Sequence, residues 1–207
     1  MSERPSAEAR RRPLAVAITG GIGAGKSEAL GAFARQGVPT ISSDEIVHRL
    51  LREDDDVRAA LVERFGTRVL DGHGRPDRAA IAEIVFADRG QLAWLEELLH
   101  PRVAQEYLRW RDELARRPDP PAVCVTEVPL LYEVGGEKRF DAVVAITAPR
   151  DLRARRSPVA LEARERRLLP DDEKARRADF AYVNDGTLAD LDAFVAGVVA
   201  ELTPRAA

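Results

Sequence analysis

The chain has 207 residues, 45% of them hydrophobic, which is enough to bury one core carrying an insertion but short for two independent domains. Its 32 basic and 35 acidic residues give a net charge of -3, so the overall balance provides no basis for binding nucleic acid or an anionic membrane. No apolar stretch approaches the ~20 residues that cross a bilayer, and the single cysteine, Cys124, cannot form an internal disulfide. We therefore expect a cytoplasmic protein in which Cys124 is a small core residue.

The fold is expected to begin at Leu14. Residues 14–19 form a short apolar run that ends in glycines, which is typical of a buried strand entering a tight turn. Between 25 and 36 apolar residues recur at helical spacing, and Gly37 ends this helix before a second short strand at 38–41. The order of strand, loop, helix and strand predicts the start of an α/β fold.

The next segment, 44–116, lacks this alternation. It shows helical periodicity broken by a turn at 71–74, so we interpret it as a helical insertion. Two apolar runs, 122–125 and 142–147, then indicate two more buried parallel strands. The parallel sheet is therefore expected to resume after the insertion.

The last part of the chain combines a charged segment with a final helix. Residues 150–178 are rich in charge and poor in large apolar side chains, which favours an exposed helical hairpin outside the core. From Leu188 onward apolar residues repeat at helical spacing to the C-terminus. We thus expect a core formed by 14–43 and 117–207, interrupted by the helical insertion 44–116.

A glycine-rich motif carries the strongest chemical signal. Residues 20–27 read Gly-Gly-Ile-Gly-Ala-Gly-Lys-Ser and match G-x-x-x-x-G-K-[ST] between a predicted strand and a predicted helix. In such a loop the backbone N–H groups and the helix N-terminus hold phosphates, Lys26 adds positive charge and the Ser27 hydroxyl ligates magnesium. The motif therefore predicts ATP and Mg²⁺ binding. The nucleotide-contacting residues are expected to be Gly21, Ile22, Gly23, Ala24, Gly25, Lys26, Ser27 and Glu28.

Asp44 follows the second predicted strand directly. Residues at the carboxyl ends of parallel strands converge on the ligand crevice, so Asp44 is expected to face the phosphates. There its carboxylate would accept the proton of an attacking hydroxyl or help to hold magnesium. The alternative is an N-cap for a helix starting at Glu45, and one side chain can serve both purposes.

Several separated motifs together resemble the dephospho-CoA kinase family. The resemblance covers about residues 14–200 and depends on the order and spacing of the motifs as well as on their composition. The matching segments are Thr-Gly-Gly-Ile-Gly-Ala-Gly-Lys-Ser at 19–27, Ser-Asp-Glu-Ile-Val-His at 43–48, Leu-His-Pro at 99–101, Val-Pro-Leu-Leu-Tyr-Glu at 128–133, Ala-Asp-Phe at 178–180 and Asn-Asp-Gly at 184–186.

This resemblance implies a P-loop kinase fold with a parallel sheet core, a helical substrate-binding insertion and a short helical lid at about 150–178. It implies transfer of the ATP γ-phosphoryl group to the ribose 3'-hydroxyl of dephospho-CoA, the last step of coenzyme A biosynthesis. Asp44 matches the family's catalytic base, and Lys26 would stabilise the transferring charge. His100 and Arg102 would lie near the substrate, whereas Arg153 in the lid and Asn184 near the adenine would contact ATP.

Some of these residues have a second interpretation. His100 with Pro101 can equally mark a helix break with a packed imidazole. Glu127 can hold magnesium through water or simply end a strand. Asn184 can cap a turn. The lid arginines can bind phosphate or form a solvated helical face; they are Arg153, Arg156, Arg164 and Arg167.

The sequence departs from the family pattern at three positions. Glu28 stands where the family usually has Thr, Ser42 replaces the first acid of an Asp-x-Asp pattern, and Leu168 stands where Gln is common in a lid that is short here. None of these changes removes the phosphate loop or the base. The rival predictions are a kinase of the nucleoside-monophosphate type and a nucleotide-binding regulator without turnover, and a monomer or weak homo-oligomer is expected.

Overall fold

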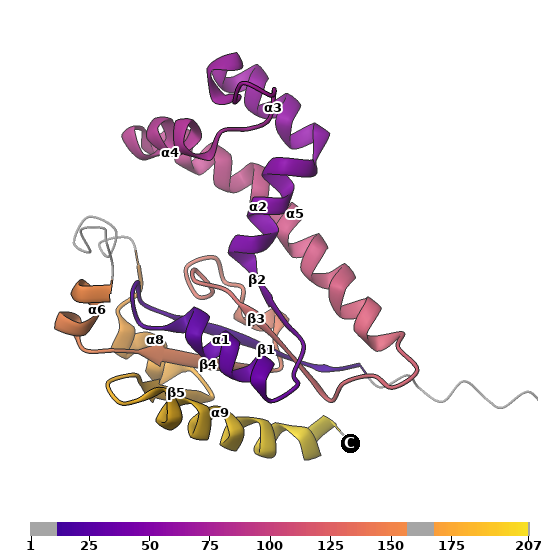
Figure 1. Cartoon of the computed structure of the whole chain (residues 1–207), viewed down its shortest axis with the longest axis vertical. Helices are drawn as coiled ribbons and strands as arrows, with labels where there is room; N and C mark the ends of the chain where they lie inside the picture. The colour runs from indigo at the N-terminus through magenta and orange to yellow at the C-terminus, as the bar shows by residue number, and fades with distance from the viewer. Residues whose placement is uncertain (1–11, 157–167, 207) are drawn as a thin grey trace, which may run out of the picture. The chain divides into compact units, whose positions relative to one another are not determined.

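The computed structural model describes residues 12–156 and 168–206, which divide into two compact units (Figure 1). One unit contains the chain up to Ser42 together with the residues from Trp110 onward, and the other is Ser43–Arg109. The predicted boundaries were 14–43 with 117–207 and 44–116. We describe the two units separately and call them the sheet unit and the helical unit.

The sheet unit is built on five parallel strands in the order β2-β3-β1-β4-β5. They are β1 (Leu14–Gly20), β2 (Thr40–Ser42), β3 (Val123–Glu127), β4 (Ala142–Thr147) and β5 (Phe180–Val183). The central strand β1 has β3 on one side and β4 on the other, and every residue of β3 is buried. The predicted α/β class with a parallel sheet is confirmed.

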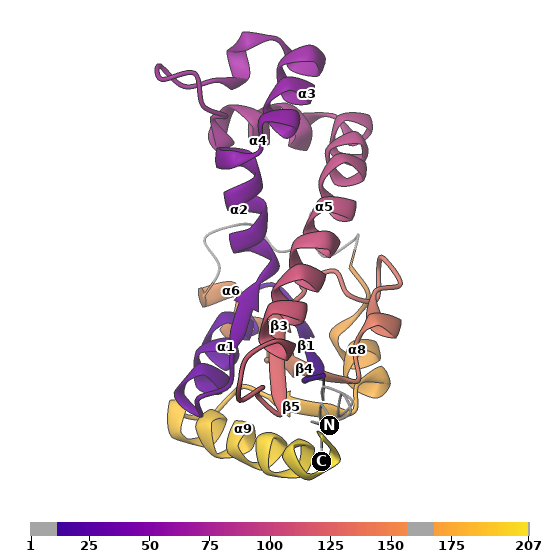
Figure 2. The same cartoon turned by 90° about the vertical axis from the view of Figure 1, so that its right-hand side faces the viewer.

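Helices cover both faces of this sheet, so β1 and β4 are buried almost throughout (Figure 2). Val16 and Ile18 of β1 point to the face covered by α1 (Lys26–Arg35) and α9 (Leu188–Leu202), which contribute Phe33 and Leu191 to the same cluster. Ala17, between them, packs on the opposite face with other apolar residues, Leu131 and Val143. Burial on both faces explains the continuous apolar runs of these strands.

Strand β5 was not expected from the sequence. It pairs with β4 at the edge of the sheet, where Phe180 and Tyr182 are half-buried and Ala181 and Val183 are exposed. Phe180 and Tyr182 pack against the main core cluster, and Tyr182 stacks on Phe194 of α9 with ring centroids 4.8 Å apart. The period-2 alternation over only four residues is a weak signal beside a conspicuous turn motif.

The expectation that 150–178 forms an exposed hairpin outside the core is wrong for its second half. Helix α6 (Arg150–Arg156) has no buried residue, but α8 (Asp171–Arg177) packs against β4 and β1 and buries Lys174 completely. A hydropathy pattern cannot predict that a lysine is buried, because such burial requires a partner that is distant in the sequence. Arg164 and Arg167 lie outside the described residues.

The helical unit consists of α2 (Ser43–Glu53), α3 (Asp55–Phe65), the 3₁₀ turn η1 (Thr67–Val69), α4 (Arg78–Ala87) and most of α5 (Arg89–Ala115). Its buried apolar residues include Ile46, Leu50, Leu61 and Val85. Asp54 and Asp77 cap α3 and α4 through N–H bonds to their side chains. Two more 3₁₀ turns, η2 (Glu137–Arg139) and η3 (Thr203–Ala206), belong to the sheet unit.

Helix α5 passes through Pro101 without interruption, so the interpretation of His100 and Pro101 as a helix break is wrong. A proline removes the hydrogen bond to the carbonyl four residues earlier. Here that carbonyl belongs to Glu97, and both Glu97 and Pro101 are exposed, so water can solvate it. Leu99 and Tyr107 are buried on the other side and hold the helix together across the proline.

Cys124 is a buried residue of β3, as expected. Desolvation raises the pKa of its thiol from 9.0 to about 12, so almost no thiolate exists at neutral pH. We expect the native protein to react with 5,5'-dithiobis(2-nitrobenzoate) only as fast as it unfolds, and the denatured chain to react at once. Rapid labelling of one thiol in the native protein would contradict this placement.

No helix in residues 12–156 and 168–206 is long and apolar enough to cross a membrane.

Candidate active site

The glycine-rich loop follows the central strand and leads into α1, as the motif predicts. Gly25, which precedes α1, has φ +97°, and a Cβ there would lie 2.2 Å from Nδ2 of Asn184. Gly23 has φ +74°, and a Cβ there would lie 2.8 Å from the backbone oxygen of Arg153. Glycine is therefore required at both positions by the backbone and by close neighbours.

The side chain of Lys26 lies along this loop. Its Nζ donates a hydrogen bond of 2.9 Å to the carbonyl of Gly21, and the backbone N–H of Ala24 also bonds to that carbonyl at 3.3 Å. Lys26 is half-buried, as is Ile22, whereas Gly21 and Ala24 are buried. The ammonium group is thus placed within the curl of the loop, where a phosphate would be held.

Ser27, in the first turn of α1, meets Glu127 at the carboxyl end of β3. The Ser27 Oγ donates to Glu127, with distances of 3.2 Å to Oε2 and 3.4 Å to Oε1. Glu127 is only 5% exposed, and the sheet register pairs it with Ser42 of β2 on one side and Ile18 of β1 on the other. A hydroxyl and a carboxylate at this position are the hard oxygen ligands that Mg²⁺ prefers.

Two residues predicted to contact ATP approach the loop from later parts of the chain. Asn184 is 8% exposed, and its Nδ2 donates to the carbonyl of Ala24 at 2.9 Å. The backbone of Arg153 lies against Gly23, and the Nε of its side chain donates to the carbonyl of Ala148 at 3.1 Å. Asn184 therefore does more than cap a turn, because it binds the phosphate loop directly.

The other lid and loop residues are placed less closely. Arg156 is exposed and donates from Nη1 to the carbonyl of Asn184 at 3.3 Å. Glu28 is exposed in the first turn of α1, where its Oε1 lies 3.6 Å from Nη1 of Arg35. The structure therefore gives Glu28 a local partner on its own helix.

Asp44 belongs to the helical unit, in the first turn of α2 and two residues after the end of β2. Helix α2 begins at Ser43, so Asp44 lies inside the helix and is not its N-cap. Its side chain is exposed. The N-cap alternative for Asp44 is therefore wrong, and its predicted roles as a base or in holding magnesium stay predictions.

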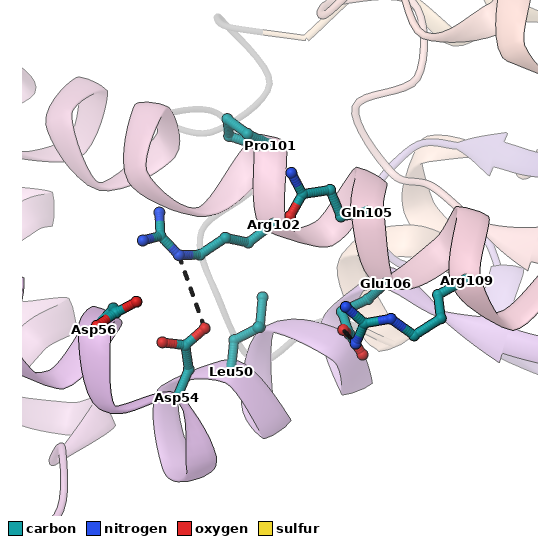
Figure 3. A pocket seen from close by; sticks show the side chains of 8 residues that line it. All are labelled: Leu50, Asp54, Asp56, Pro101, Arg102, Gln105, Glu106 and Arg109. Atoms are coloured by element: carbon teal, nitrogen blue, oxygen red, sulfur yellow. Dashed lines mark hydrogen bonds and ion pairs between the residues drawn. The ribbon is translucent and has the colours of Figure 1, made fainter.

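His100 and Arg102 occupy different surroundings on α5. His100 is exposed, so the imidazole is not packed as one interpretation expected. Arg102 donates from Nη1 to the carbonyl of Leu98 at 2.9 Å, and its Nε lies 3.8 Å from Asp54 (Figure 3). Arg102 lines a cavity of about 440 Å³ within the helical unit, and His100 does not. The cavity is lined by Leu50, Asp54, Asp56, Pro101, Arg102, Gln105, Glu106 and Arg109.

Sequence reasoning missed three charged residues in or bonded to α8, one of which lies beside the phosphate loop. Asp171 lies against Gly21, where a Cβ would be 2.5 Å from its Oδ2, and its Oδ2 is 3.5 Å from Nε of Arg153. Lys174 and Glu133 form an ion pair of 2.8 Å. The Pro-Leu-Leu-Tyr-Glu stretch that contains Glu133 was noticed only as a family motif, and its contact with α8 has no signature in sequence spacing.

A glycine-rich phosphate loop after the central strand of an open parallel sheet, with a lysine and a serine at the start of the next helix and an acid at the end of the neighbouring strand, defines a P-loop fold of the phosphoryl-transferring class. The sequence profile of dephospho-CoA kinases matches residues 14–190, which is most of the chain. The protein therefore belongs to the dephospho-CoA kinase family, as the resemblance indicated.

Individual relatives agree with this assignment. The chain is 37% identical to the dephospho-CoA kinase of Rhodopseudomonas palustris (strain HaA2), over 81% of this chain and 84% of the relative. It superposes on the crystal structure of a Thermus thermophilus protein with a TM-score of 0.75 and 35% identity, covering 92% of this chain and 98% of that one. The dephospho-CoA kinase from Campylobacter jejuni gives a TM-score of 0.65 and 26% identity, over 92% and 97% of the two chains.

Proposed function

We propose that this protein transfers the γ-phosphoryl group of ATP to the ribose 3'-hydroxyl of dephospho-CoA, giving coenzyme A and ADP. The single observation that carries the proposal is the geometry of the phosphate loop. Nζ of Lys26 bonds to the Gly21 carbonyl, and Oγ of Ser27 bonds to the buried Glu127. Membership of the dephospho-CoA kinase family supports this acceptor. The reaction would take place in the cytoplasm without nucleic acid or a membrane, in a monomer or weak homo-oligomer.

The loop would bind the triphosphate through its backbone N–H groups, with Lys26 exchanging the Gly21 carbonyl for phosphate oxygens. Positive charge at this position stabilises the charge that develops on the phosphoryl oxygens in the transition state. Arg153 and Asn184, which border Gly23 and Ala24, would also contact the nucleotide. The loop thus combines binding with transition-state stabilisation.

Asp44 would act as the general base. Its carboxylate would accept the proton of the 3'-hydroxyl as that oxygen attacks the γ-phosphorus and the bond to the β,γ-bridging oxygen of ATP breaks, so that ADP leaves. Asp44 follows β2 by two residues, and β2 ends at Ser42 beside Glu127 in the sheet. Chain connectivity therefore supports a role for Asp44 at this end of the sheet.

Ser27 and Glu127 would hold Mg²⁺, Ser27 directly and Glu127 directly or through water. Their hydroxyl and carboxylate oxygens fit the donor set that this ion requires, and they already lie within 3.2 Å of each other. When bound, the ion would neutralise charge on the β- and γ-phosphates. All the oxygen ligands named here come from the ends of β3 and the phosphate loop.

Replacing Glu127 with Gln keeps the size of the side chain but removes its charge. We expect the Mg²⁺ concentration for half-maximal rate at fixed ATP to rise by roughly 10–100-fold, because residues that orient a metal contribute that factor to its affinity. This concentration is measured from initial rates over a Mg²⁺ titration. The control is Glu113→Gln, at an exposed position of α5. An unchanged Mg²⁺ requirement combined with a lower rate would show that Glu127 has another role.

The helical unit would bind dephospho-CoA. Arg102 lies on the wall of its cavity, and the exposed His100 lies two residues earlier on α5. A guanidinium and an imidazole are suitable donors for the phosphate oxygens of this substrate. The assignment of His100 and Arg102 to substrate binding is supported by membership of the dephospho-CoA kinase family.

The proposal is tested by ADP release with ATP and Mg²⁺ in the presence of single acceptors. Dephospho-CoA, nucleoside monophosphates, shikimate and gluconate would each be compared with a reaction that contains no acceptor. We expect rapid turnover with dephospho-CoA alone. Faster turnover with another acceptor would overturn the assigned substrate, and ATP binding without any acceptor-dependent turnover would overturn the kinase activity.

A further inference from the structure

Lys174 is a fully buried lysine that the proposed reaction does not use. Its Nζ lies 2.8 Å from Oε1 of Glu133 and donates to the carbonyl of Pro129 at 3.3 Å. A buried ion pair is expensive to desolvate and is a poor source of stability, so its presence calls for a second reason. The other contacts of Glu133 and Lys174 suggest what that reason is.

Glu133 joins the loop after β3 to the beginning of α8. Its Oε1 accepts the backbone N–H of Leu169 at 2.9 Å as well as contacting Lys174. The C-terminal end of α8 is fixed separately, because Asp179 accepts the N–H of Val143 and donates its own N–H to the Val143 carbonyl. Helix α8 is therefore tied down at both ends, and Glu133 holds the end nearer to the phosphate loop.

The same network reaches the base of the phosphate loop. The carbonyl of Pro129, which accepts from Lys174, also accepts from the hydroxyl of Thr19 at 3.3 Å. Thr19 is fully buried and immediately precedes Gly20. Lys174 is thus linked through one carbonyl oxygen to the strand that leads into the loop.

The first residue of α8 faces the loop itself. Asp171 lies against Gly21, and its Oδ2 is 3.5 Å from Nε of Arg153. Nε of Arg153 also donates to the carbonyl of Ala148, and the side chain is only 11% exposed. Because a guanidinium is planar, contacts at Nε fix the orientation of the whole group. A carboxylate beside a phosphate loop would repel nucleotide unless it served to hold such a cation.

We propose that Glu133 and Lys174 are positioning residues for nucleotide binding. They hold α8 so that Asp171 keeps the Arg153 guanidinium oriented at the phosphate loop, where it binds a phosphate of ATP. The proposal rests on the proposed function in assigning ATP to the loop. It explains why a charged pair occupies a buried site that apolar side chains would fill at lower cost.

The test is a double-mutant cycle between Glu133→Gln and Arg153→Ala. The dissociation constant of a non-hydrolysable ATP analogue is measured by calorimetry, together with the KM for ATP, the kcat and the melting temperature of each variant. We expect Glu133→Gln to weaken nucleotide binding by about tenfold in the wild-type background, within the range of coupling between connected residues. In the Arg153→Ala background the same change should weaken binding by less than about twofold, because the group it acts through is gone.

A second variant covers the case in which Glu133→Gln does not fold. Asp171→Asn removes the charge next to Arg153 from a partly exposed position and should show the same loss of effect in the Arg153→Ala background. Asp172→Asn, on the adjacent exposed residue, is the control and should bind nucleotide as the wild type does. Equal weakening in both backgrounds, or a lower melting temperature with unchanged binding, would overturn the proposal. Because binding is measured without dephospho-CoA, failure of the acceptor assignment would not affect this result.

Discussion

Replacing Asp44 with asparagine is expected to lower kcat by roughly 10²–10⁴-fold, which is the usual contribution of a general base. The substitution preserves the shape of the side chain but leaves no group that can take the proton of the 3'-hydroxyl. The KM for ATP should change little, because Lys26 and the loop N–H groups bind the phosphates. Steady-state kinetics with both substrates measure these quantities.

The neighbouring acid provides the control for this experiment. Glu45→Gln removes an equally exposed charge from the same first turn of α2 and should leave kcat within about twofold of the wild type. Circular dichroism would establish that both variants are folded. If Asp44→Asn were folded and retained most of its kcat, another group would have to be the base.

Replacing Lys26 with methionine is expected to have a comparable effect by a different route. The variant loses the ammonium that lies over Gly21, and with it a charge that stabilises the transferring phosphoryl group. We expect kcat/KM for ATP to fall by roughly 10²–10³-fold, the loss that follows removal of one transition-state donor. The measurement is the initial rate over a range of ATP at saturating dephospho-CoA.

Lys138→Met, at an exposed residue of η2, is the matched control and should keep the wild-type kcat/KM. Since Lys26 also bonds to the Gly21 carbonyl, the melting temperature of each variant should be recorded. A Lys26→Met protein with wild-type kcat/KM would be inconsistent with phosphoryl transfer at this loop.

Local sequence signals were sufficient to predict the elements that are set by residues close together in the chain. The strand, glycine loop and helix from Leu14 to Arg35 follow from apolar runs and from backbone positions that only glycine adopts easily. Arg153 and Asn184 were predicted to contact ATP through the family motifs alone, since both residues are far from the loop in sequence. The structure shows that Asn184 bonds to the Ala24 carbonyl and that the Arg153 backbone lies beside Gly23, and their contact with ATP stays a prediction.

What the sequence could not predict depends on partners that are distant along the chain. Lys174 was assigned to an exposed hairpin because a lysine is normally solvated, and its partners in the buried site, Glu133 and the Pro129 carbonyl, come from more than 40 positions earlier. For the same reason Asp171 was not recognised as a neighbour of Gly21. At Pro101 the rule that proline ends a helix failed, because the carbonyl that loses its bond is on the exposed side of α5.

The most direct test of the central claim is the position of the transferred phosphoryl group. The product formed from ATP, Mg²⁺ and dephospho-CoA would be examined by ³¹P NMR and compared with authentic coenzyme A. Our account predicts one new phosphomonoester on the ribose 3'-oxygen, formed in equal amount with ADP. A phosphoryl group at any other position, or ADP accompanied by inorganic phosphate without a new ester, would contradict it.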